Sequence, residues 1–282
     1  MSSADYCRRV CRRSRSSFRF AFGLLPPAKR DAMHALYAFL RASDDLADEP
    51  GEVAAKRIAL AHWRERLDAA LTGSYSHRCH AALHSAVRTF GIPPAHLHAV
   101  LDGCETDLKP VKFQSFEPLR AYCYRVASAV GLACVRIWGV RAGATFEQAE
   151  PFAEAAGYAY QLTNVLRDLG EDRGRGRVYL PADELARFDC PPEGWDAPSA
   201  RFGELMAFQV ARARAYYQQS EPLAGLLTPE GRAIFTLMTT AYRQLLDRVA
   251  AAGPGVLTRR VRLPWWRKAA LAGRAWGYQW IG

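Results

Sequence analysis

Several features that would direct a protein to a membrane or an oxidising compartment are missing from this 282-residue chain. It has no run of about 20 apolar residues, so we predict no transmembrane helix. Its basic N-terminus, residues 1–18, lacks the apolar core of a secretory signal. Its seven cysteines form neither a CxxC pair nor a Cys/His zinc pattern. Together these absences favour a cytoplasmic protein with reduced thiols.

Lysine is also scarce, although the chain is basic. The formal net charge is +10, yet only 5 of the 38 basic residues are lysine. Arginines cluster at 8–19 and 259–274 with no nucleic-acid-binding motif between them, so we expect no nucleic-acid partner. An arginine-rich genome, anionic substrates or an anionic membrane surface would each account for the charge. Trp265 and Trp266 lie within the C-terminal cluster, which suits either peripheral membrane contact or packing onto the body of the protein.

Strand patterns are absent as well, and apolar residues recur at helical spacing along the chain. The hydrophobic fraction is 50%, enough for a buried core, and no change in composition divides the chain. We therefore predict an all-α protein with a single domain over residues 1–282. The main predicted helices cover residues 28–48, 52–71, 95–107, 119–140, 146–169, 200–220 and 229–251.

One polar stripe stands out on the helix that leads to residues 170–176, an Arg/Gly segment expected to end it. Asp168 and Asp172 are one helical turn apart, so their carboxylates point the same way. Gln161 and Asn164 fall within roughly 80° of them on a helical wheel. The opposite stripe is apolar and would pack into a core. The sequence thus predicts a helix that presents four oxygen-bearing side chains to one site.

A second stripe of this kind lies upstream and ends at Pro50-Gly51. Tyr37, Arg41, Asp44 and Asp48 share one helical face within roughly 60°. Oxygen ligands suit Mg²⁺, which takes one or two carboxylates together with substrate phosphates. Two facing aspartate pairs therefore predict a Mg²⁺ cluster around a diphosphate. The alternative for either pair alone is a solvated helix surface.

Two further patterns allow more than one interpretation. His77, His80 and His84 have spacings of three and four residues, as in some metal sites, but without a partner carboxylate a surface helix is the preferred interpretation. The segment 119–140 is apolar on nearly every face and contains many small residues. It could pack tightly against neighbouring helices or line a tunnel for an apolar ligand.

Four segments together resemble the squalene/phytoene synthase family: SSFRFAF, YAFLRASDDLADE, YCYRVASAVG and QLTNVLRDLGEDRGRGRVYLP. They extend over about residues 14–181, and the last is the most specific. The first aspartate motif also occurs in head-to-tail prenyl diphosphate synthases, but those enzymes repeat DDxxD where this chain has NxxxDxxxD. The resemblance implies a helical isoprenoid synthase fold with a central cavity. It also implies head-to-head (1′-1) joining of two prenyl diphosphates.

The resemblance also assigns roles to residues. It implies Mg²⁺ ligands at Asp44, Asp48, Asn164, Asp168 and Asp172. It places Tyr122 near the reacting carbons, and the four aspartates and Tyr122 form the implied catalytic set. Implied substrate contacts are Ser17, Tyr37, Arg41, Gln161, Asn164, Arg167 and Tyr242.

The substrate is less defined by the motifs. Farnesyl diphosphate is the first expectation, giving presqualene diphosphate and from it squalene or dehydrosqualene; the alternative is a phytoene synthase that joins two geranylgeranyl diphosphates. Gly174 and Gly176 follow a helix rather than a strand, so no dinucleotide fingerprint is present, and use of NADPH stays open. We expect a monomer or weak oligomer. A basic membrane- or RNA-binding helical protein without catalysis is the alternative from another class, but it would be expected to carry broken motifs.

Overall fold

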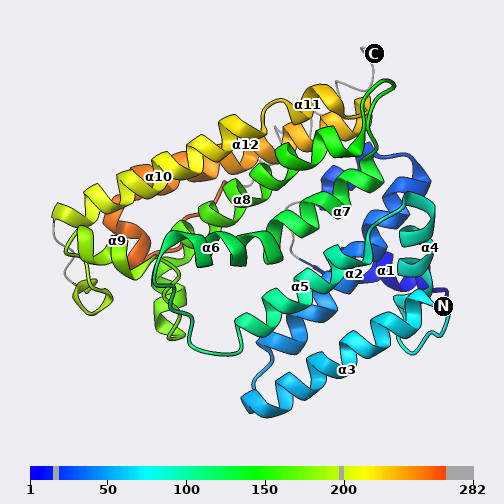
Figure 1. The fold of residues 1–282 in the computed structure, drawn as a ribbon, viewed down its shortest axis with the longest axis horizontal. Coiled ribbons are helices and arrows are strands. Elements are labelled where there is room, and N and C mark those ends of the chain that lie inside the picture. Colours follow the sequence, from blue (N-terminus) through cyan, green and yellow to red (C-terminus); the bar gives the residue numbers. More distant parts are fainter. Residues whose placement is uncertain (15–18, 197–199, 265–282) are drawn as a thin grey trace.

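The computed structural model describes residues 1–14, 19–196 and 200–264 and confirms the all-α prediction (Figure 1). Within these ranges the only extended pairings are two isolated bridges, Lys112 with Val178 and Val140 with Leu227. The assignment of one domain stays a prediction.

The helices, with η for short 3₁₀ or π turns, are α1 (Ser3–Arg13), η1 (Arg19–Leu24), α2 (Pro27–Asp48), α3 (Val53–Leu71), α4 (His80–Phe90), α5 (Pro94–Thr106), α6 (Phe116–Cys123), η2 (Tyr124–Ser128), α7 (Ala129–Trp138), α8 (Phe146–Gly174), α9 (Ala182–Arg187), η3 (Pro192–Gly194), α10 (Ala200–Ser220), α11 (Leu223–Leu226), α12 (Pro229–Ala252) and η4 (Gly253–Leu257).

The two helices that carry the aspartates begin and end where local chemistry requires. Pro27 opens α2 at a position whose missing N–H is not needed by the helix. Thr145 and Gln148 form a reciprocal capping box at the start of α8. This helix continues through Gly170 and ends at Gly174, within the predicted Arg/Gly segment. Both aspartate pairs consequently lie at helix C-termini.

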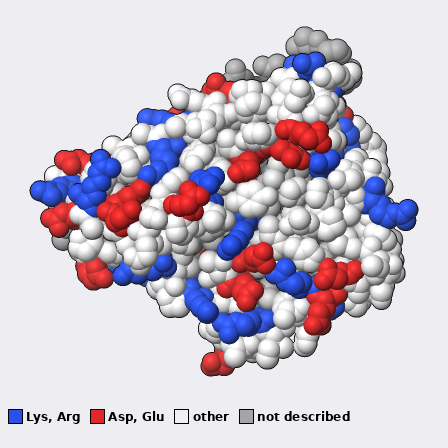
Figure 2. All heavy atoms as spheres, in the orientation of Figure 1, with Lys and Arg blue, Asp and Glu red and all other residues white. Residues whose placement is uncertain are grey.

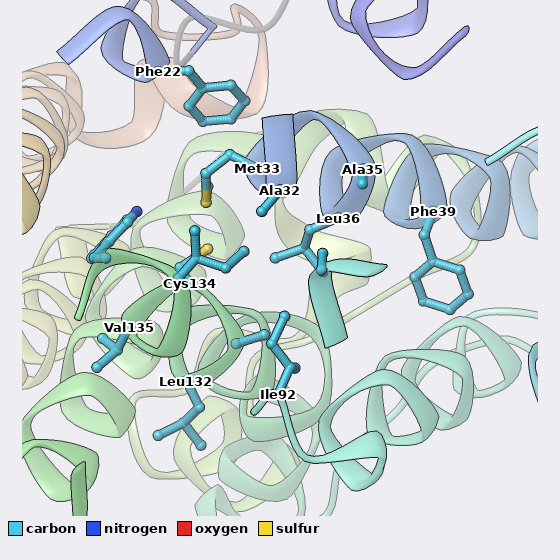
Figure 3. Close-up of a cluster of buried hydrophobic side chains, with 14 of the residues drawn as sticks. Phe22, Ala32, Met33, Ala35, Leu36, Phe39, Ile92, Leu132, Cys134 and Val135 are labelled. Carbon is cyan, nitrogen blue, oxygen red and sulfur yellow. The ribbon is translucent and has the colours of Figure 1, made fainter. Parts of the chain in front are cut away.

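The long helices α8, α10 and α12 run side by side along one edge of the molecule, and α1 to α5 occupy the opposite part (Figure 1). A core forms around α2, where Leu36 and Phe39 are fully buried. Figure 3 shows Phe22, Met33 and Cys134 gathered in this core from three different elements. A second core forms beneath α8 and α10, around Leu166 and Phe202.

The predicted helix 119–140 is interrupted by the π turn η2, which packs very closely on α8. A Cβ on Gly157 would lie 2.4 Å from the Cα of Ser128, so only glycine allows this approach. The Ser128 hydroxyl donates to the carbonyl of Glu154 at 2.8 Å. This contact fixes the position of α8 relative to the small-residue segment, and π turns of this kind are frequent at functional sites.

The surface gives partial information on partners. On the face drawn in Figure 2, acidic and basic side chains are interspersed, so the net positive charge is not gathered into one patch there. Among the described helices, none is both long and apolar enough to cross a membrane. Ser17, Trp265 and Trp266 lie outside the described residues, so the substrate role of Ser17 and the peripheral membrane contact stay predictions.

Candidate active site

An apolar cavity of about 260 Å³ lies between α2, the η2–α7 segment, α8 and α12. Val126, Ala127, Val130 and Gly131 line it, so the tunnel interpretation of the small-residue segment holds for these four. Ala129 instead packs in a core with α5, because the π turn changes which residues face the cavity. The same segment thus serves both as a wall and as a packing surface.

α2 and α8, the helices that carry the aspartates, both change from apolar to polar toward their C-termini. On α2 the lining passes from Met33 to Leu40, and Asp44 follows one turn later. On α8 it passes from Ala153 to Asn164, and Asp168 follows one turn later. Because each helix dipole places partial negative charge at its C-terminus, the carboxylates and the helix ends together favour a cation. The cavity therefore has apolar walls, and we call the end toward the aspartates, one turn beyond its lining on both helices, its acidic mouth.

The aspartate pair on α2 has few counter-charges. Asp44 accepts only a weak contact from the Cys104 thiol, at 3.9 Å, among the contacts of the described residues. Surrounding protein and the neighbouring charge of Asp48 raise the pKa of Asp44 to about 7. The Asp44 side chain still contacts water, which screens this effect. Asp48 is exposed and lies 3.9 Å from the Arg177 guanidinium.

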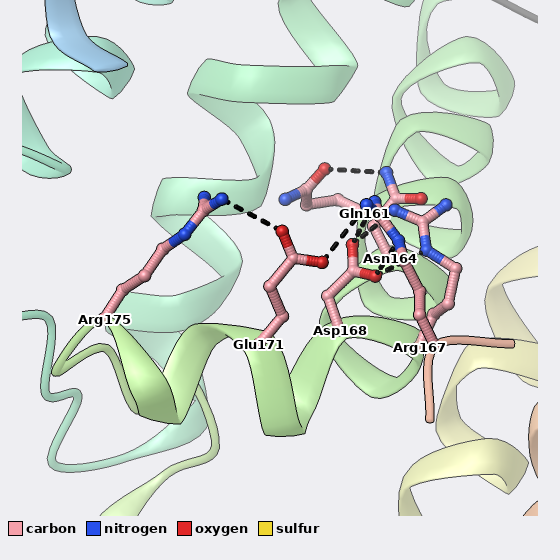
Figure 4. A network of polar contacts seen from close by, with 7 residues as sticks. Gln161, Asn164, Arg167, Asp168, Glu171 and Arg175 are labelled. Carbon is pink, nitrogen blue, oxygen red and sulfur yellow. Dashed lines mark hydrogen bonds and ion pairs between the residues drawn. The ribbon is translucent and has the colours of Figure 1, made fainter. Parts of the chain in front are cut away.

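On α8 it is Asp168 that is surrounded by arginines (Figure 4). Arg167 donates to Asp168 from Nε at 2.8 Å and also through its Nη2. Arg260 lies 2.9 Å from the same carboxylate and 3.1 Å from Glu171. Burial and the charge of Asp168 raise the pKa of Asp172 to about 6. Two arginines therefore neutralise Asp168 before any metal ion binds.

Arg260 is a site residue that the sequence did not identify. It lies 92 residues from Asp168 in a basic segment that we had connected with a membrane surface or packing. The approach depends on Gly170, where a Cβ would lie 2.1 Å from the Leu257 carbonyl oxygen. No helical repeat or other local pattern in the sequence relates Arg260 to Asp168.

Asp107 is a second site residue that the sequence did not identify; it is partly buried. It accepts hydrogen bonds from the hydroxyls of Tyr122, at 2.9 Å, and Tyr179, at 2.8 Å. The two tyrosine rings are stacked with centroids 5.2 Å apart. Arg177 donates to the Asp107 carbonyl at 2.9 Å, which links this group to Asp48. Burial raises the pKa of Asp107, as expected for an enclosed carboxylate.

The remaining predicted site residues lie in three different parts of the structure. Tyr37, Gln161, Asn164 and Tyr242 line the apolar cavity, and Tyr242 stacks on Tyr160 at 4.6 Å. Tyr122 lies beside Asp107 and is not part of the cavity lining. Arg41 pairs with Asp45 and lines a different cavity on the other side of α2. The roles assigned to these residues stay predictions.

The oxygen-bearing residues fit a divalent metal ion. The Oδ1 atom of Asn164 is buried and has no hydrogen-bond partner among the described residues. A buried acceptor without a partner is costly, and a cation would satisfy it. The raised pKa values of Asp44 and Asp172 likewise indicate negative charge that still lacks compensation. Asp44, Asp48, Asn164, Asp168 and Asp172 could together hold Mg²⁺, which prefers oxygen ligands.

Comparison with known proteins agrees with this geometry. The family model for squalene/phytoene synthase matches residues 11–267. The chain belongs to the squalene/phytoene synthase family. Enzymes of this family are prenyltransferases that act on prenyl diphosphates, generally with a divalent metal. The recognition made from the four motifs is confirmed.

Several relatives are similar over most of their length. The chain is 33% identical to a 15-cis-phytoene synthase of Synechocystis, covering 96% of this chain and 84% of that protein. It is 32% identical to that of Synechococcus elongatus, with coverages of 94% and 89%. Phytoene synthase 3 of Zea mays is 36% identical over 92% of this chain, which spans 62% of the length of that relative.

Solved structures show the same fold. A dehydrosqualene synthase in complex with a ligand superposes with a TM-score of 0.87 at 25% identity, covering 99% of this chain and 97% of the other. A squalene synthase from Alicyclobacillus acidocaldarius gives a TM-score of 0.81 at 24% identity, with coverages of 89% and 94%. The predicted isoprenoid synthase fold is therefore confirmed.

Proposed function

We propose that this protein joins two geranylgeranyl diphosphates head to head, as a phytoene synthase. The observation that carries the proposal is an apolar cavity lined by two helices, α2 and α8, that each carry an aspartate pair beginning one turn beyond the lining. The choice of the C20 substrate rests on the relatives described above, which are phytoene synthases at 32–36% identity. It reverses the order expected from the motifs, which placed farnesyl diphosphate first.

Two sets of residues have different roles: charged residues bind the diphosphate groups, and apolar residues exclude water. The two aspartate pairs and Asn164 would hold Mg²⁺, which would supply positive charge to stabilise a departing diphosphate. Arg167 and Arg260 lie beside Asp168 and can exchange their carboxylate contacts for phosphate oxygens, to which guanidinium groups bind with two donors. The C–O bond of one substrate breaks and its diphosphate leaves, the double bond of the other supplies the electrons for the new C–C bond, and a proton is lost as a cyclopropane closes. Loss of the second diphosphate and of a second proton then gives the C40 hydrocarbon.

The cavity itself protects the reaction. Its walls are formed mainly by aliphatic and aromatic side chains, such as Leu36, Val130 and Phe235. A carbocation formed at the mouth would react with water unless the chain and the walls exclude it. The Tyr122–Asp107–Tyr179 group supplies oriented hydroxyls beside the acidic mouth, and we assign it a positioning role.

A farnesyl substrate is the second candidate, supported by the similarity to the dehydrosqualene synthase structure. Phe22 and Met33 lie at the end of the cavity away from the aspartates, where the far end of a prenyl chain would lie. Because side chains there limit the depth of the cavity, they decide whether a C15 or C20 chain fits.

A product assay tests both candidates. The purified protein is incubated with Mg²⁺ and either farnesyl or geranylgeranyl diphosphate, with and without NADPH, and the lipids are identified by mass spectrometry. A C40 hydrocarbon from the longer substrate supports the proposal. Presqualene diphosphate or a C30 hydrocarbon from farnesyl diphosphate alone would overturn the C20 assignment, and squalene formed only with NADPH would show that the cofactor is used. No product from either substrate would contradict the proposed activity while leaving the fold unaffected.

A further inference from the structure

A cluster of nitrogen and sulfur ligands lies at the start of α4, away from the aspartate cavity. His77, Cys79 and His80 each bring one ligand atom to within 4.8 Å of the others. Cys79 and His80 are fully buried, and His77 is partly buried. The burial of His80 corrects the surface-helix interpretation for this histidine, whereas His77 and His84 are partly exposed. His77 precedes the helix, and the chain turns it back toward the helix start.

One ring nitrogen of His80 in this cluster has no hydrogen-bond partner among the described residues. The Nδ1 of His80 accepts the backbone N–H of His77 at 3.2 Å. Its Nε2 is buried and has no hydrogen-bond partner among the described residues. Its ring neighbours, Trp63 at 5.1 Å and His77 at 5.5 Å, offer mainly aromatic faces. Because Nδ1 accepts, the neutral ring carries its proton on Nε2. A metal ion can bind Nε2 once that proton moves to Nδ1 and the 3.2 Å contact with the His77 N–H is given up.

The spacing of the ligand atoms suits one tetrahedral ion. The Nδ1 of His77 lies 3.1 Å from the Sγ of Cys79. Zn–N and Zn–S bonds of about 2.0 and 2.3 Å place two such ligands roughly 3.5 Å apart. His77 Nδ1 also accepts the backbone N–H of Cys79 at 3.3 Å, so side-chain rotations that replace this contact would bring all three atoms around one ion. No carboxylate belongs to the cluster, which disfavours Mg²⁺ and favours an ion that prefers nitrogen and sulfur.

The protonation states agree with this ligand set. Burial lowers the pKa of His80 to about 4 and also lowers that of His77, so both imidazoles are neutral, the form that binds metal. Burial raises the pKa of the Cys79 thiol to about 12. A metal ion must displace this proton, and its charge makes a coordinated thiol a thiolate. Binding would release one proton.

The cluster is held in position, and one of its three residues, His77, borders a cavity. Ser3 of α1 donates to the Arg78 carbonyl at 2.7 Å and accepts from the Ala82 N–H at 3.0 Å, which ties the segment to α1. A cavity of about 470 Å³ between α1, α2 and α3 includes His77 in its lining and shares no lining residue with the apolar cavity. It provides an entry path and space for a water molecule.

We propose that His77, Cys79 and His80 bind one Zn²⁺ ion, with a water molecule from the adjacent cavity as fourth ligand. The ion would connect the start of α4 to the segment before it and stabilise this part of the fold. The site is independent of the proposed prenyl transfer.

Cobalt substitution tests the proposal on the full-length, chelator-treated protein. Co²⁺ bound by a thiolate gives a charge-transfer absorption band that carboxylate-bound Co²⁺ does not, so binding at the aspartates is not confused with this site. We expect one equivalent of Co²⁺ to produce the band, and one equivalent of Zn²⁺ to abolish it and raise the melting temperature. Absence of the band, or a band that Zn²⁺ does not remove, would overturn the proposal.

Variants locate the site. Cys79→Ser is expected to remove the band, and His80→Asn to weaken Zn²⁺ binding at least roughly tenfold. The matched control is His84→Asn on the same helix, since His84 contacts the Tyr75 hydroxyl at 2.8 Å instead of the cluster. If circular dichroism shows that the buried variants do not fold, the partly buried His77→Ala decides the matter by the same loss of affinity. Equal Zn²⁺ affinity in His77→Ala and the unmodified protein would show that these residues are not the ligands.

Discussion

The two aspartate pairs have the same spacing on helices with the same polarity, yet the structure gives them different electrostatic surroundings. Asp168 on α8 is held by Arg167 and by Arg260. Among the described residues Asp44 on α2 has a thiol contact and no ion pair, and its pKa is raised to about 7. A carboxylate already compensated by arginines, as Asp168 is, can exchange them for metal and phosphate together. Asp44 has no ion pair among the described residues, so we expect Asp44 to govern metal affinity and Asp168 to govern diphosphate binding.

The largest effect is expected from removing one carboxylate of each pair. Asp44→Ala and Asp168→Ala should each lower kcat/KM by about 100- to 1,000-fold, because electrostatic stabilisation of the leaving diphosphate is lost. Asp44→Ala should also raise the Mg²⁺ concentration needed for half-maximal activity more than Asp168→Ala does. Steady-state kinetics over a range of Mg²⁺ concentrations provides the measurement.

The control for this comparison is Asp45→Ala. Asp45 is adjacent to Asp44 in sequence but pairs with Arg41 at the other cavity. Its variant should keep most of the activity, and far-UV circular dichroism should show that all three variants fold. Full activity in Asp168→Ala would contradict the metal cluster, and equal Mg²⁺ dependence in the two aspartate variants would remove the distinction between the pairs.

An intermediate effect is expected from displacing Arg260 without changing it. Gly170→Ala puts a Cβ 2.1 Å from the Leu257 carbonyl oxygen, so the segment that carries Arg260 must move away from α8. We expect a loss of about 1–3 kcal/mol in the free energy of unfolding. Activity should fall with it, mainly through a higher KM for the diphosphate substrate, as Arg260 leaves Asp168.

Gly174→Ala is the matched control, because it lies on the same helix with nothing within 4 Å of the added Cβ. Chemical denaturation and substrate kinetics of both variants supply the data. Equal stability and KM in the two would mean that the close approach at Gly170 does not position Arg260.

The smallest effect is the dependence of stability on pH. The folded-state pKa values of Asp44 and Asp172, about 7 and about 6, are raised above the ordinary value of 3.8. The folded protein therefore binds protons more tightly than the unfolded chain. Its free energy of unfolding is highest below about pH 4 for these groups and falls as pH rises through 6 to 7. Because water reaches Asp44, we expect a decrease of only about 1 kcal/mol.

Melting temperatures of the chelator-treated protein across this pH range would reveal the decrease. Mg²⁺ should reduce it, since the ion compensates the charge that deprotonation creates. Asp44→Asn should have a flatter profile than Asp168→Asn. A profile that rises with pH in the unmodified protein, or an identical slope in both variants, would contradict the contrast between the pairs.

The helices and the two polar stripes could be predicted from sequence because their determinants are local. Asp44 and Asp48, like Asp168 and Asp172, share a face through the helical repeat alone. The small residues of 119–140 indicated a cavity wall or close packing, but not which residues would take each part. The π turn at Tyr124–Ser128 decided that, and it forms where Gly157 lets α8 approach the backbone of Ser128.

The sequence by itself determined the helical class, the family and the acidic stripes, since each rests on periodicity or on a contiguous motif. Only the tertiary structure decided which charges neutralise those stripes. Arg260 reaches Asp168 across 92 residues, and Asp107 meets Tyr179 across 72. The convergence of His77 on His80 likewise depends on a turn held by Ser3 of α1. Such contacts form when separate helices pack, and packing depends on the shape and burial of whole surfaces, which no local spacing encodes.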